Sequence, residues 1–153
     1  MVDLVPTTRL LPTVAGTAIE PFWAATAQER LCFPFCECCA AVRWPLRGAC
    51  PHCHRPTPVR WQDVEPTGRV VSHTRVHRRF HPAIPEVPYW IALVELAHGI
   101  RIVGGFDGGG EPPRVGQAVR PRFEHLPTAT LVSWQPRRPE VAQAAAEDRE
   151  VNP

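Results

Sequence analysis

The chain has 153 residues, a hydrophobic fraction of 44% and a formal net charge of +2, which fit one ordinary globular domain or two small ones that share a core. So small a net charge predicts no strong electrostatic field for a nucleic acid or a membrane surface. All 17 basic residues are arginines, so any anion site would be built from guanidinium groups, which suit phosphate and carboxylate. The 19 prolines argue against long helices.

The first segment, residues 1–30, is predicted to be an N-terminal extension followed by a helix at about 18–29. Thr17 and Glu20 have the spacing of a capping box, and Ile19, Phe22, Trp23 and Ala27 recur at helical spacing. We expect this helix to pack on its own domain; a docking helix for a partner protein is the alternative.

Residues 31–62 are predicted to form a metal module. Cys36 and Cys39 make one Cys-x2-Cys pair, and Cys50 and Cys53 make a second pair ten residues later. This is the ligand spacing of a structural Zn²⁺ site with four sulfurs, flanked by short strands as in a zinc ribbon. Iron could use the same sulfurs, in which case electron transfer would be the function.

Two other cysteines, Cys32 and Cys38, stay outside this prediction. A register that uses Cys38 in place of Cys39 is conceivable, but two intervening residues let both thiolates of a pair face one ion. No segment has the apolar length of a signal peptide or of a membrane span. We therefore expect a cytoplasmic protein, in which paired Cys-x2-Cys motifs favour metal over disulfides; a secreted disulfide domain is the alternative.

Residues 63–136 carry strand signals at regular spacing. We expect strands at 69–79, 89–96, 100–106, 117–125 and 130–135, with a tight turn at His98-Gly99 and a bulge or sharp bend at Gly104-Gly105. Residues 89–96 are apolar on both faces, which predicts a central strand. The fold class is therefore mainly β: an N-terminal helix and a rubredoxin-like zinc ribbon, followed by a five-stranded OB-fold barrel, with a small sandwich as the rival shape. Residues 137–153 are polar and acidic, and are predicted to be a flexible tail.

The order of these motifs resembles the acyl-CoA-associated OB-fold proteins that carry an N-terminal rubredoxin-like zinc ribbon, long known as a domain of unknown function. The resemblance spans about residues 18–135 and is carried by Pro21-Phe22-Trp23, the cysteines from Cys36 to Cys53, residues 88–96 with Gly99, and residues 115–119. It implies a non-catalytic accessory subunit beside a thiolase-like or aldolase-like enzyme, including thiolases of the lipid-transfer type. It also implies help with complex assembly and with acyl-CoA handling.

One local basic cluster could bind coenzyme A. Arg75, Arg78 and Arg79 lie beside Phe80, and guanidinium groups next to an aromatic ring could contact phosphates and adenine. The same cluster could instead bind single-stranded nucleic acid, as OB folds often do, or remain a solvated or partner-facing strand end. The low net charge makes nucleic acid the weaker reading, and an enzyme that acts alone on acyl-CoA is a third hypothesis.

Overall fold

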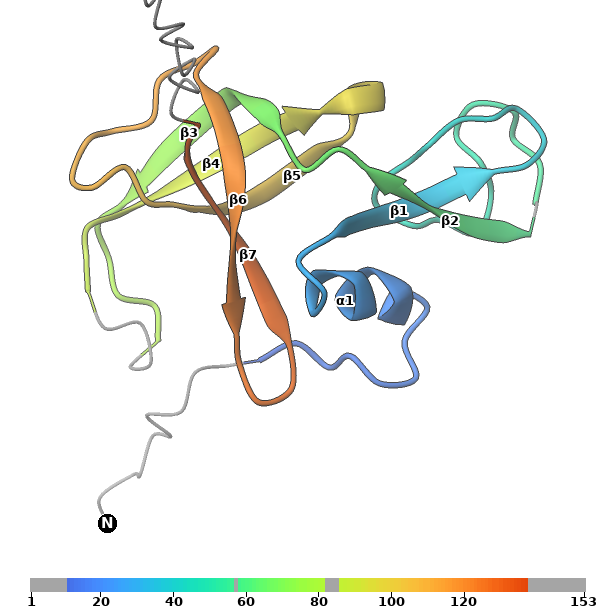
Figure 1. Cartoon of the computed structure of the whole chain (residues 1–153), viewed down its shortest axis with the longest axis horizontal. Coiled ribbons are helices and arrows are strands. Elements are labelled where there is room, and N and C mark those ends of the chain that lie inside the picture. Colours follow the sequence, from blue (N-terminus) through green and yellow to red (C-terminus); the bar gives the residue numbers. More distant parts are fainter. Residues whose placement is uncertain (1–10, 57, 82–85, 138–153) are drawn as a thin grey trace, which may run out of the picture.

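The computed structural model describes residues 11–56, 58–81 and 86–137. Two sheets make up the described fold (Figure 1). The first is an antiparallel two-stranded ribbon, and the second is a closed barrel with the strand order β3-β4-β5-β7-β6. The elements are α1 (Glu20–Thr26), β1 (Leu31–Cys36), β2 (Val59–Val64), β3 (Gly68–Val76), β4 (Tyr89–Leu96), β5 (Arg101–Phe106), β6 (Ala118–His125) and β7 (Thr130–Pro136). The mainly β prediction with an OB-type barrel is confirmed, and the sandwich is excluded.

The helix is shorter than predicted, and the predicted capping box is wrong. Thr17 donates its hydroxyl to the carbonyl of Val14 at 2.8 Å, so the hydroxyl does not cap the helix. Glu20 is the first helical residue, and its carboxylate accepts a hydrogen bond from the backbone of Gly16 at 3.0 Å. At the other end Glu29 has a φ of 57°, which ends the helical path.

Phe22 fixes α1 to the ribbon. Its ring is 4% exposed and lies 4.8 Å from the ring centroid of Trp44 and 5.9 Å from that of Phe33. The helix therefore packs on its own chain, and Figure 1 shows it lying between β1 and the barrel strand β7, both of which it contacts. This agrees with the expectation that the helix packs on its own domain.

The barrel contains β4 as a central strand, as predicted, because β4 pairs along its length with β3 on one side and β5 on the other. The turn between β4 and β5 is also as predicted: His98 and Gly99 both have positive φ, 61° and 68°. In contrast, β6 and β7 form a hairpin that joins the rest at narrow seams. One seam is the parallel pair Phe106–Trp134, and the other is a short stretch at the start of β3.

A bulge or a sharp bend was predicted at the two glycines of β5, and the bulge is wrong. Pairing between β4 and β5 runs without interruption through Gly104 and Gly105, and the register shift lies in β3 between Val70 and Ser72. Gly104 instead allows close packing. A Cβ placed on it would lie 2.9 Å from Nε1 of Trp134, whose side chain is fully buried in the barrel.

Candidate metal centre

The same backbone turn presents both cysteine pairs. In the first pair the amide of Ala40 donates to the carbonyl of Cys36 at 2.8 Å; in the second the amide of His54 donates to the carbonyl of Cys50 at 2.8 Å. Ala40 and His54 both adopt positive φ, 57° and 58°. Glycine is the usual residue in this region of φ, so each turn accepts some backbone strain in order to close.

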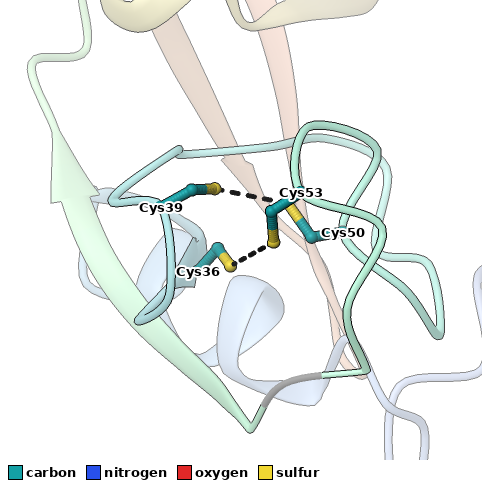
Figure 2. A group of neighbouring side chains, drawn as sticks. All are labelled: Cys36, Cys39, Cys50 and Cys53. Carbon is teal, nitrogen blue, oxygen red and sulfur yellow. Dashed lines mark hydrogen bonds between the residues drawn. The ribbon is translucent and has the colours of Figure 1, made fainter.

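The two turns bring four sulfurs together. The Sγ atoms of Cys36 and Cys53 are 3.8 Å apart, and those of Cys39 and Cys50 are 3.6 Å apart (Figure 2). All four lie within 4.8 Å of one another. A tetrahedral ion with metal–sulfur bonds of about 2.3 Å requires sulfurs about 3.8 Å apart. The four-cysteine cluster (Cys36, Cys39, Cys50 and Cys53) could therefore hold one metal ion.

Backbone amides tune these thiols. The amides of Cys53 and, more weakly, of His52 donate to the sulfur of Cys50 and lower its pKa against the opposing effect of burial. For Cys53 the Arg55 amide lowers the pKa, but burial and hydrogen bonds shared with neighbouring thiols, first that of Cys36, outweigh it and raise the pKa to about 12. Four thiols that share hydrogen bonds cannot all ionise without a cation. Amides that point at sulfur favour the thiolate, which is the metal-binding form.

The remaining cysteines lie outside the cluster. Cys38 is exposed, and Nη1 of Arg55 donates to its sulfur at 3.5 Å. Cys32 is buried on β1, and its pKa is raised by burial and then by the carboxylate of Asp63. A raised pKa keeps a thiol protonated and unreactive near neutral pH.

Sequence reasoning did not single out Arg43, which follows the first turn. Its side chain is 4% exposed, and none of its three guanidinium nitrogens has a hydrogen-bond partner. Arginine is almost never fully buried unless it is paired. In the sequence, the only available signal was a charged residue between apolar neighbours, Val42 and Trp44.

The four residues proposed for coenzyme A lie at or just beyond the end of β3. Arg75 is on the strand, and Arg78, Arg79 and Phe80 follow it, with the ring of Phe80 72% exposed. Arg75 faces Trp90 across the β3–β4 pairing, and its guanidinium carbon lies 5.5 Å from the centre of the indole.

His73 approaches the same indole edge-on, with its ring centroid 5.5 Å away at 73°. The sequence had not linked Trp90 to the basic cluster, because that link depends on the register between two strands.

No helix in the described part of the chain is long and apolar enough to cross a membrane.

The chain is similar in sequence and structure to several known proteins. The profile of the family described as ChsH2, C-terminal OB-fold domain, matches residues 61–124. A probable enoyl-CoA hydratase alpha subunit of Thermomonospora curvata is 39% identical over 102 residues, which are 65% of this chain and 31% of that protein. The chain thus spans about a third of the length of that relative.

Two further relatives match over most of their length. A DUF35 domain-containing scaffold protein of Methanocaldococcus jannaschii is 31% identical over 102 residues, covering 65% of this chain and 72% of that protein. A chain in the solved structure described as an Ltp2-ChsH2(DUF35) aldolase superposes with a TM-score of 0.69 at 30% identity, covering 82% of this chain and 98% of that one. The chain described here therefore belongs to the DUF35 family.

Proposed function

We propose that this chain is a non-catalytic, cytoplasmic accessory subunit of a thiolase-like acyl-CoA enzyme, with an aldolase or a lipid-transfer-type thiolase as its partner. The observation that carries the proposal is the match over 98% of a chain in the Ltp2-ChsH2(DUF35) aldolase. Almost nothing of that chain lacks a counterpart here. The relative named as a hydratase subunit supports a role in acyl-CoA metabolism in the wider family.

The accessory role is tested by co-expression. The full chain is expressed with each thiolase-like protein of the source organism in turn, with an affinity tag on the partner only. We expect both chains to elute together from the affinity column and from a sizing column. A chain that stays a lone monomer beside every thiolase-like protein of its host would overturn the proposal.

Two controls separate the rival functions. Incubating the purified chain with acyl-CoA thioesters should release no thiol; thiol release would favour an enzyme that acts alone. A generic single-stranded oligonucleotide should not bind at moderate salt, because only a few phosphate contacts are available to the small basic cluster. Binding that weakens steeply with salt would favour the nucleic-acid alternative.

The metal proposed for the four-cysteine cluster is structural Zn²⁺. Four thiolates would complete a tetrahedral shell, so the ion would keep no open position for substrate. When bound, it would supply folding free energy by holding the two turns together. We also propose that the metal-binding unit spans residues 31–62 and that the barrel spans residues 63–136.

Adjacent cysteines provide a matched test of the metal. Elemental analysis should find about one zinc per chain. Cys39→Ser and Cys50→Ser each remove a cluster sulfur and should lose the zinc and the ribbon fold. Cys38→Ser, one position away and exposed, should keep both. A fully folded chain free of metal, or equal zinc content in all three variants, would refute this assignment.

For acyl-CoA handling we propose the end of β3, where Arg75, Arg78 and Arg79 would contact phosphates and Phe80 would offer a ring to adenine. Arg75 already lies over the indole of Trp90, so a flat, positively charged surface is present on the strand itself. Arg78→Gln with Arg79→Gln should weaken coenzyme A binding to the complex, measured by calorimetry. Arg101→Gln, which removes an exposed arginine paired with Glu95, is the control and should not weaken it.

A further inference from the structure

The buried guanidinium of Arg43 is the least satisfied polar group in the described part of the chain. Its Nε and both Nη atoms are buried, and none has a hydrogen-bond partner. An isolated charge in a protein interior costs several kcal/mol unless an opposite charge compensates it. The described fold supplies no carboxylate for it, so its compensation has to come from another negative group.

Backbone pairing shows which face Arg43 occupies. Residues 41–43 run antiparallel to β1, because the Cys36 amide donates to the carbonyl of Ala41 and the Arg43 amide donates to the carbonyl of Pro34, both at 2.9 Å. Phe35 and Val42 form the bridge between these two bonds. Arg43 therefore lies opposite Pro34, and Cys36 lies opposite Ala41.

Side chains alternate between the two faces of a strand pair. Pro34 and Cys36 share one face, and Arg43 joins them because it lies opposite Pro34. The next residue, Trp44, checks this assignment: it packs on Phe33 at 5.5 Å, on the other face and toward α1. Arg43 therefore belongs to the same buried face as Cys36, whose side chain is 0% exposed.

Cys36 brings the four-cysteine cluster to the end of that face, where Cys36 and Cys50 are buried, Cys53 is half-buried and Cys39 is exposed. Four thiolates around a divalent ion would leave a net charge of about −2 at this site. We propose that Arg43 is the buried counter-charge of the metal–thiolate centre, a positioning residue that raises metal affinity without being a ligand. The inference rests on the proposed metal in the four-cysteine cluster. It would explain why a cation without a hydrogen-bond partner is buried, because charges interact more strongly away from bulk water.

The chain offers its own control cation. Arg55 also lies near the cluster, and its Nη1 donates to the sulfur of Cys38 at 3.5 Å. Arg55 is exposed, so solvent and salt screen its charge. The proposal therefore predicts a large effect at Arg43 and a small one at Arg55.

The experiment measures zinc affinity of the full chain by competition with a coloured chelator. Arg43→Met and Arg43→Gln remove the charge and should weaken zinc binding by about 10–100-fold, the usual effect of losing a group that supports metal ligands. Arg43→Lys keeps the charge and should stay within a few-fold of the parent chain, as should Arg55→Gln.

The outcomes are distinguishable. If the parent chain binds no zinc, the proposed metal fails together with this inference. If it binds zinc but Arg43→Gln binds equally well, only the counter-charge is refuted. If Arg43→Lys loses as much affinity as Arg43→Met, the side-chain shape matters and the charge does not, which also refutes it. Saturating zinc should restore the fold of both neutral variants by mass action, and their failure to fold under that condition would overturn the proposal.

Discussion

Gly104→Ala tests how closely the barrel strands approach one another. The new Cβ would lie 2.9 Å from Nε1 of Trp134, 2.9 Å from the carbonyl oxygen of Val132 and 3.0 Å from Cδ1 of the same indole. Trp134 is fully buried, so its ring cannot move aside into solvent. Inserting a methyl group into a packed core usually costs about 1–3 kcal/mol, and we expect about 2 kcal/mol here because one of the crowded atoms belongs to the backbone.

Gly105→Ala is the matched control, since its Cβ would meet only the Cβ of Ser133, at 3.8 Å. This variant should change the free energy of unfolding by no more than about 0.5 kcal/mol. Unfolding in urea, followed by tryptophan fluorescence with metal in excess, gives both values. Equal stability of the two variants would show that Trp134 does not pack against Gly104 as described.

Three other predictions follow from single residues. His98→Asn should stabilise the chain by up to about 1 kcal/mol in thermal melts, because asparagine tolerates the positive φ of 61° better than histidine does; a lower melting temperature would contradict this. Phe22→Ala should cost about 3–5 kcal/mol, since its buried ring anchors α1, whereas Phe80→Ala, at a ring that is 72% exposed, should be nearly neutral in the same melts. Burial and the carboxylate of Asp63 raise the pKa of Cys32 above its ordinary value of 9.0. As pH rises above about 9, the unfolded chain therefore loses this proton before the folded chain does, and the free energy of unfolding falls. Cys32→Ala should show a smaller fall, and a pH profile equal to that of the parent chain would refute the assignment.

The barrel strands could be predicted well because their signals are local. The run from Tyr89 to Leu96 is apolar on both faces, and β4 has these bounds. Cysteine spacing is equally local, since two residues between thiols suffice to aim both at one point. The helix was predicted too long because Thr17 and Glu20 fit a capping pattern, while the actual competition came from the carbonyl of Val14.

Long-range features were out of reach. The pairing of Phe106 with Trp134 is parallel and depends on barrel closure, which no local pattern encodes. Gly104 suggested a bulge, but its role is set by an indole from a distant strand. The contact of Arg75 with Trp90 depends on strand register, and the burial of Arg43 depends on residues 41–43 returning beside β1.

The two short pairing regions of the barrel divide it into two groups of strands. One group is the meander of β3, β4 and β5, and the other is the β6–β7 hairpin, which α1 also contacts. Because the hairpin meets the meander through Phe106–Trp134 and the start of β3, we expect the hairpin to separate from the meander more readily than β4 separates from its neighbours. Amide protons along both seams would then exchange with deuterium together, well before those in the middle of β4, whose backbone is paired on both sides.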